Sequence, residues 1–109
     1  MTDARAEAAR LQIADIARSM LAGEISFMEG ARSISAIRFM AQIENDPDIL
    51  PLVSIDTKSD TVPLGKIRNL WNRNALVELQ SEIDRKESWA RDFGRPHCEN
   101  LVRRFGETD

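Results

Sequence analysis

The chain has 109 residues, of which 42% are hydrophobic and 30% charged, with 5 Gly and 4 Pro. This balance is typical of a globular protein and excludes a fibrous or largely disordered one, so we expect a single domain over residues 1–109. The formal net charge of -3 lacks the basic excess that neutralises a phosphate backbone. Nucleic acid is therefore not an expected partner.

Cysteine content and hydropathy bear on the compartment. Cys98 is the only cysteine, so no disulfide can form within the chain, and a lone thiol fits a reducing compartment. No uncharged apolar run approaches the roughly 20 residues that span a bilayer. The first residues, MTDARAEAAR, mix charges where a signal peptide needs an apolar segment. The sequence therefore predicts a cytoplasmic protein that does not enter a membrane.

Two helices are predicted in the first part of the chain. Apolar residues at helical spacing indicate a first helix over residues 2–22, and Gly23 is placed to end it in a left-handed turn. The sequence S-F-M-E is the pattern of a capping box, in which Ser26 accepts the amide of Glu29 and starts a second helix. Because the connection is short, the two helices are expected to be antiparallel neighbours, and Gly30 would permit a close crossing between them.

The middle of the chain, about residues 45–66, is predicted to be an irregular crossing segment. The second helical pattern ends after Glu44 at N-D-P-D, where Asp46 and Pro47 can start a short helical turn. After Pro51, L-V-S-I-D alternates apolar and polar residues over too few positions to decide between a small hairpin and an extended crossing. Both alternatives remain open.

Helical spacing returns in the second half. Asn72 or Asn74 is expected to cap a long helix whose apolar face extends to Phe93. Pro96 is expected to stop or kink this helix, because proline lacks an amide hydrogen and clashes with the preceding turn. A last helix then covers residues 96–105. The predicted fold is all-α, a small helical bundle of about four main helices with the crossing segment between two helical pairs.

Residues that could carry chemistry do not form a known catalytic or metal-binding motif. Asp56, Lys58 and Asp60 begin like a calcium loop, but Lys58 occupies an acidic position, and the two aspartates are expected to cap turn amides. His97 and Cys98 are adjacent on a predicted helix and point about 100 degrees apart, so they are not expected to form a thiol-base pair. We expect no catalytic residue, no metal and no cofactor.

Residues on and beside the crossing segment are candidates for contact with a partner. These are Asp56, Lys58 and Asp60 on the segment and Trp71 beside it. Trp71 is included because exposed aromatic side chains contribute most to interface energies when they fill pockets. Trp89 is a further candidate of the same kind, although a core position is the preferred interpretation of both tryptophans.

Glu29, Arg38 and Arg68 form a second group of candidates. Glu29 and Arg38 lie near the ends of apolar helix surfaces, where a partly buried arginine needs a carboxylate or carbonyl partner. Glu29 or a loop aspartate could supply that partner, and we expect a buried polar cluster that ties the crossing segment to the bundle. The same three residues are the basis of an alternative function, an enzyme or small-ligand-binding bundle.

Three segments carry a resemblance to a known family: GEISFMEGARSI at 23–34, SIDTKSDTVPLG in the crossing, and the closing WARDF and CENLVRRF. Over about residues 21–105 the chain resembles a widespread family of small bacterial helical proteins of unknown function. Their crossing reads more like IDSETD, so Thr57, Lys58 and Ser59 depart from it. Such small acidic helical proteins are similar in size and character to the immunity proteins that neutralise bacterial toxins.

The leading hypothesis is therefore a non-enzymatic bacterial protein that acts by binding a protein partner, with toxin neutralisation as its narrower form. The enzyme or ligand-binding bundle is one alternative, and a homo-oligomer assembled through a helix face is another.

Overall fold

The computed structural model of the chain describes residues 3–59 and 73–106. Its helices are α1 (Ala4–Leu21), α2 (Phe27–Ile37), α3 (Leu50–Lys58) and α4 (Arg73–Phe105). No strand occurs in the described ranges. The predicted all-α class with four main helices is confirmed.

Helix α1 ends as its sequence predicts but begins at Ala4, two residues later than expected. Asp3 caps its start, because the Asp3 carboxylate accepts the backbone amide of Arg5 at 2.9 Å. Gly23 follows its end with φ 79, the left-handed conformation that glycine adopts without strain. The buried face of α1 consists mostly of small side chains, which let a neighbouring helix approach closely. Its members are Ala6, Ala9, Ile13, Ala14, Ala17 and Met20.

Helix α2 starts at the predicted cap and crosses α1 closely. The Ser26 hydroxyl accepts the amide of Glu29 at 3.0 Å. A Cβ on Gly30 would collide with the buried side chain of Met20, so the predicted close approach at Gly30 is confirmed. The helix is shorter than its apolar stripe indicated. It ends at Ile37 because the chain turns there, and Gln42 adopts φ 59 within that turn.

A carboxylate from α4 completes the start of α2. The side chain of Glu87 accepts the amide of Phe27 at 2.7 Å and that of Met28 at 3.1 Å. These amides belong to the first turn of a helix and have no partner within it. The negative charge also lies at the positive end of the helix dipole. Glu87 therefore joins the amino terminus of α2 to the middle of α4.

Part of the predicted irregular crossing is helical. Residues 50–58 form α3 instead of a hairpin or an extended strand, so both alternatives are wrong for this part. Pro51 lies in the first turn, where its missing amide hydrogen costs no hydrogen bond. Leu52 and Ile55, three residues apart, are fully buried on the same face. Burial of that face stabilises a helix whose short pattern was ambiguous.

The prediction that Pro96 separates two helices is also wrong, because α4 continues through Pro96 from Arg73 to Phe105. Pro96 is exposed, so its ring projects away from the packed surface. On the opposite side Ala90, Cys98 and Leu101 are fully buried. Their contact with the other helices stabilises the helical conformation on both sides of the proline.

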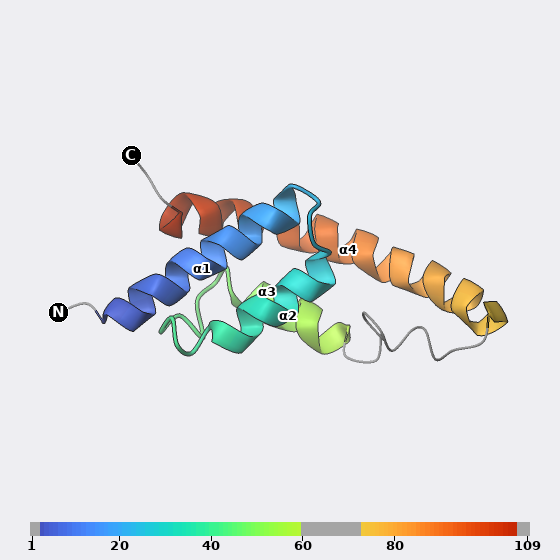
Figure 1. The fold of residues 1–109 in the computed structure, drawn as a ribbon, viewed down its shortest axis with the longest axis horizontal. Coiled ribbons are helices and arrows are strands. Elements are labelled where there is room, and N and C mark those ends of the chain that lie inside the picture. Colours follow the sequence, from blue (N-terminus) through green and yellow to red (C-terminus); the bar gives the residue numbers. More distant parts are fainter. Residues whose placement is uncertain (1–2, 60–72, 107–109) are drawn as a thin grey trace.

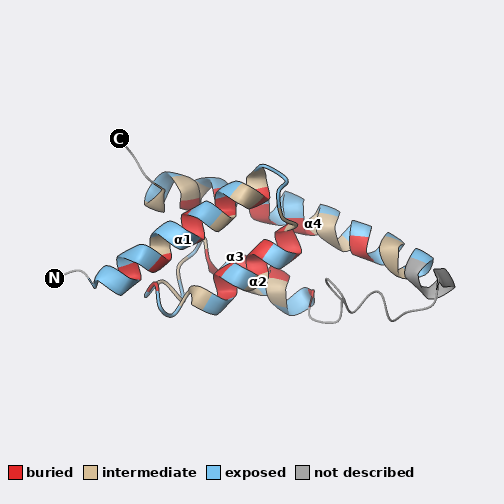
Figure 2. Ribbon diagram, in the orientation of Figure 1, coloured by how far each residue is buried: buried red, intermediate tan, exposed pale blue. Residues whose placement is uncertain are grey.

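The helices pack as pairs, with α1 mainly against α4 and α2 mainly against α3. Figure 1 shows α1 and α4 running in opposite directions, so that the start of α1 and the end of α4 lie at the same end of the molecule. Buried residues gather where the four helices meet (Figure 2). The first turns of α4 project beyond this core, and the molecule measures 55 × 22 × 21 Å. Within the described ranges, none of the helices is long and apolar enough to cross a membrane.

Candidate functional site

Three ring side chains follow one another along the surface of α4. Trp89, Phe93 and His97 are spaced four residues apart, which places them on one side of the helix. The rings of Trp89 and Phe93 stack with centroids 5.4 Å apart, and His97 meets Phe93 edge-on at 6.3 Å. Phe93 is 40% exposed. We call these three residues the aromatic row.

The aromatic row runs beside the core face of α4. Gly94 is buried on that face, and a Cβ at its position would lie against Ile55 and Leu52 of α3 and Phe27 of α2. Trp89 packs partly against the core, so the expectation of a core position holds for one part of its surface. Phe93 was expected on the core face and lies at its border instead. The row is thus anchored on one side and accessible on the other.

A cationic pocket adjoins the Trp89 end of the row. It has a volume of about 300 Å³ and is lined by Lys58, Arg85, Lys86 and Trp89. The Lys58 ammonium lies 4.9 Å from the centre of the Trp89 ring, a cation–π contact between α3 and α4. Lys86 pairs with Glu82 at 3.4 Å and reaches the Lys58 carbonyl at 3.4 Å.

A polar cluster of five residues lies at the His97 end. The Asp48 carboxylate accepts from His97 Nδ1 at 2.9 Å, from the Asn100 amide at 3.0 Å and from Arg104 at 2.8 Å. Arg104 also holds both carboxylate oxygens of Asp46, at 2.7 and 2.6 Å. The cluster ties the segment before α3 to the last turns of α4. We call it the Asp48 cluster.

The hydrogen bonds of the Asp48 cluster set its charges. Burial alone would raise the pKa of Asp48, but hydrogen bonds from Asn100, His97 and Arg104 outweigh it and hold that pKa below 3.8. The hydrogen bond from Arg104 likewise lowers the pKa of Asp46, against the effect of burial. Both aspartates are therefore ionised at neutral pH. Because an ionised carboxylate can only accept, His97 Nδ1 must donate to Asp48.

The local conformation of residues 46–49 positions the two carboxylates. Asp46 accepts the amide of Asp48 at 2.9 Å through its side chain, and its carbonyl accepts the amide of Ile49 at 2.9 Å. This is the turn that N-D-P-D predicted, with Pro47 inside it. Both aspartates consequently face α4 while the buried Ile49 enters the core.

The residues predicted to contact a partner are only partly described. Asp60 and Trp71 lie outside the described residues. Asp56 is half-buried and pairs with Arg32 of α2 at 3.4 Å, so it bridges α2 and α3. Lys58 is exposed and touches Trp89, as described above. The structure therefore brings Lys58 to the aromatic row and directs Asp56 toward a different helix.

The expected polar cluster of Glu29, Arg38 and Arg68 does not form between its two described members. Glu29 is exposed. Arg38 donates to the carbonyl and the hydroxyl of Ser35, at 2.7 and 2.6 Å, and lies over the ring of Phe39. Its partner is thus within its own turn, which removes the need for a carboxylate. Arg68 lies outside the described residues.

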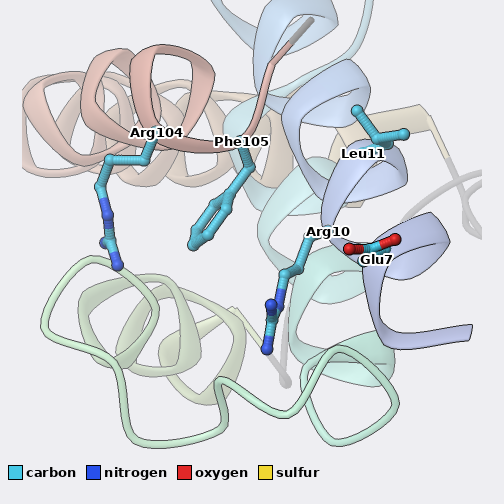
Figure 3. A pocket seen from close by; sticks show the side chains of 5 residues that line it. All are labelled: Glu7, Arg10, Leu11, Arg104 and Phe105. Carbon is cyan, nitrogen blue, oxygen red and sulfur yellow. The ribbon is translucent and has the colours of Figure 1, made fainter. Parts of the chain in front are cut away.

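A second pocket, of about 310 Å³, lies between α1 and the end of α4. Figure 3 shows its five side chains, with the ring of Phe105 directed into the space between Arg104 and Arg10. Both arginines already have partners, because Arg10 donates to the Ala41 carbonyl at 2.9 Å and Arg104 binds Asp46. Glu7 and Leu11 complete the lining. With its charges largely satisfied, this pocket is the weaker candidate.

Cys98 is fully buried, as predicted, and burial raises the pKa of its thiol to about 12. A thiol of this kind is not ionised at neutral pH and is a poor nucleophile. The adjacent His97 is turned toward Asp48. The expectation that these neighbours do not form a thiol-base pair is met by both observations.

Sequence reasoning missed Asp48, Asn100 and Arg104. The spacing of His97, Asn100 and Arg104 by three and four residues did contain a signal, because it places polar groups on one side of a helix. The predicted break at Pro96 concealed that signal. The partner loop could not be identified without the fold, because Asp48 lies 49 residues from His97 along the chain.

In the part of the chain that the structure describes, no group of three or more His, Cys, Asp or Glu side chains is placed to hold a metal ion. No protein-family model matches the chain, and no curated protein or solved structure matches it either.

Proposed function

We propose that this is a non-enzymatic helical protein that binds another protein through the aromatic row of α4. The observation that carries the proposal is the row of contacting rings, in which the exposed Phe93 stacks on the partly buried Trp89 and meets the partly buried His97 edge-on. Aromatic side chains are enriched at interfaces because they remove a large rigid apolar area from water at a small cost in conformational entropy. The row supplies such an area along about 12 Å of helix.

The row is also held ready for binding. Trp89 is fixed by Lys58 on its ring face and by Phe93, and His97 is fixed by Asp48. A partner would therefore meet side chains that already have one conformation, which lowers the entropy lost on association. Both ends of the row are anchored by α3 or the segment before it, so the surface depends on tertiary structure.

A competing exposed surface is the turn after α2, where Phe39 is 62% and Met40 60% exposed. These are two adjacent residues of one turn. Phe39 is contacted by the guanidinium of Arg38, its immediate neighbour in the chain. Isolated exposed apolar side chains are common on soluble proteins, whereas a stacked series beside a pocket is not. The turn therefore serves as the control surface.

The enzyme alternative has less support. Of its proposed residues, Glu29 is exposed and Arg38 donates to Ser35 of its own turn, and the Cys98 thiol is buried with a raised pKa. Toxin neutralisation remains the narrower form of the proposal. It rests on the resemblance in size and character to immunity proteins, and it would make the partner a bacterial toxin.

Capture with matched variants tests the proposal. Wild-type protein, Phe93→Ala and Phe39→Ala are each immobilised and offered an extract of the source cells. We expect one specific protein to be retained by wild type and Phe39→Ala and lost, by about tenfold or more, with Phe93→Ala. Equal retention by both variants would refute the proposal. Retention of further copies of this chain alone would favour the homo-oligomer instead.

A further inference from the structure

The cationic pocket concentrates positive charge on an acidic protein. The whole chain has a net charge of -3, yet the pocket beside Trp89 is lined by Lys58, Arg85 and Lys86. Like charges that gather at one place repel one another, and the arrangement is stabilised when an anion lies between them. The question is which of these charges the protein itself already neutralises.

Lys86 is largely accounted for within the molecule. It pairs with Glu82, one turn earlier on α4, and reaches the carbonyl of Lys58 at the end of α3. A cation at that position also complements the negative end of the α3 dipole. Its role in holding α3 against α4 is sufficient to explain it.

Among the described residues that line the pocket, Lys58 and Arg85 are the two cations that form no ion pair with another described residue. The Lys58 ammonium rests on the Trp89 ring, which leaves its three N–H donors without a carboxylate among the described residues. Arg85 is exposed and forms no ion pair with any described residue. An arginine fork binds a carboxylate through two parallel hydrogen bonds. Together the two side chains can hold one or two carboxylates at the rim of the pocket.

Resting on the proposed function, we infer that the partner segment bound by the aromatic row is acidic at this end and apolar beyond it. A carboxylate of the partner lies between Lys58 and Arg85, and an apolar side chain covers Phe93. Trp89 lines the pocket and also stacks on Phe93, so the acid and the apolar residue of the partner lie on the same side of one segment. Residues three or four positions apart share one side of a helix, and the structure thus points to a partner helix with acids and apolar residues at this spacing.

Charge and shape favour a protein segment over a small anion. The pocket opens directly onto the row through Trp89, which belongs to both. A free phosphate would use Lys58 and Arg85 but would leave Phe93 uncovered. An acidic amphipathic segment satisfies the cations and covers the exposed ring at the same time.

A pair of labelled peptides tests the inference by fluorescence anisotropy. One is a helical peptide of Glu, Leu and Ala with each Glu four residues before a Leu, and its counterpart has Gln in place of each Glu. We expect the Glu peptide to bind wild type about tenfold more tightly than the Gln peptide, with the difference shrinking at high salt. Equal affinity for both peptides, or no binding of either up to about 1 mM, would overturn the inference.

Two arginines on the same helix provide the matched control. Arg85→Gln is expected to weaken binding of the Glu peptide about threefold to tenfold, and Lys58→Gln combined with it should abolish the preference for Glu over Gln. Arg95 is exposed on α4 and lies outside the pocket. Arg95→Gln makes the same change in net charge and should leave binding unchanged. If Arg85→Gln and Arg95→Gln weakened binding of the Glu peptide equally, the overall charge of the protein would explain the loss, and the inference would be overturned.

Further outcomes distinguish a failure of this inference from a failure of the proposed function. If both peptides bind equally and Phe93→Ala weakens both, the row binds protein and only the acidic preference is wrong. If inorganic phosphate displaces the Glu peptide at a similar concentration, the pocket is a small-anion site and the inference is overturned. Capture of the cellular partner by Arg85→Gln and Lys58→Gln variants at wild-type levels would also contradict it, without affecting the result for Phe93→Ala.

Discussion

At the scale of single residues, Asp48 joins distant parts of the chain through three side-chain hydrogen bonds. His97, Asn100 and Arg104 all donate to it, and its side chain is 13% exposed. A carboxylate so far removed from water is stabilised only when donors replace the lost hydration. These donors hold the loop before α3 against the end of α4 and fix the orientation of His97 in the aromatic row.

The Asp48 cluster should make stability depend on pH in the acid range. The pKa values of Asp46 and Asp48 lie below 3.8 in the folded protein, so the unfolded chain binds protons first as the pH falls. Their contribution is fully present above about pH 4 and is lost as the pH falls through the folded values. Urea unfolding followed from pH 7 to pH 2 should show the free energy of unfolding decreasing below about pH 4.

Arg104→Gln tests the origin of that dependence. Because the Arg104 side chain is 38% exposed, solvent screens part of its interaction, and we expect a loss of about 1 kcal/mol at pH 7. The difference from wild type should narrow as the pH falls and the two aspartates take up protons. Arg95→Gln, at an exposed position, should behave as wild type. A loss in Arg104→Gln that stays constant with pH would show that the ion pairs are not its cause.

At the scale of elements, the features that were predicted correctly are those that short local sequence patterns specify. The cap at Ser26, the left-handed turn at Gly23 and the buried stripe of α1 are local patterns, and each occurs where predicted. Helix α3 was missed because nine residues are too few to distinguish helix from strand when burial decides between them. The break predicted at Pro96 was wrong because packing of α4 before and after the proline offsets the cost of the proline to the helix. That packing is tertiary and cannot be predicted from a local pattern.

The candidate site was harder to predict than the helices. Lys58 was named as a candidate for contact with a partner and is exposed, but its contact with Trp89, which joins α3 to α4, was not predicted. The four-residue spacing of Trp89, Phe93 and His97 is visible in the sequence. The direction of that face toward solvent depended on how α2 and α3 cover the opposite side of α4, and that is a property of the assembled fold.

Glu87 shows how one element can depend on another. Its carboxylate accepts two amides at the start of α2 and is 15% exposed. Glu87→Ala should lower the free energy of unfolding by about 1–3 kcal/mol, because two buried amides lose their acceptor. Glu87→Gln keeps one carbonyl acceptor and should cost less. Urea denaturation of each variant measures the loss.

Glu82 is the matched control for Glu87. It lies on the same helix and pairs with Lys86 at 3.4 Å, with a side chain that is 48% exposed. Glu82→Ala should change the free energy of unfolding by less than about 1 kcal/mol, as is usual for exposed ion pairs. If Glu82→Ala and Glu87→Ala were equally destabilising, the cap on α2 would not be the reason for the loss.

At the scale of the whole molecule, the shape follows from the length of α4. Its 33 residues extend over about 50 Å at 1.5 Å per residue, and the other helices cover only part of it (Figure 1). Among its described side chains, burial is concentrated from Ile83 onward, while Val77 is 65% exposed. The radius of gyration of 15.0 Å exceeds the roughly 13 Å expected of a compact domain of this length.

Hydrogen exchange should follow this uneven burial. Amides of residues 77–82, which carry little buried surface, should exchange much faster than those around Ala90, Cys98 and Leu101, which are fully buried. Exchange followed by mass spectrometry or NMR measures the gradient along the helix. Uniform protection along α4 would mean that something besides these contacts stabilises its first turns.

A photoreactive phenylalanine analogue at one position of the chain, introduced in the source cells, tests directly whether the aromatic row binds a partner. Phe93, 40% exposed, and Phe39, 62% exposed, are a matched pair, because greater exposure alone would favour crosslinking at Phe39. We expect the analogue at position 93 to form one discrete crosslinked product with another protein and the analogue at position 39 to form none. Crosslinking at position 39 alone, or at neither position, would contradict the claim that the aromatic row binds a protein partner.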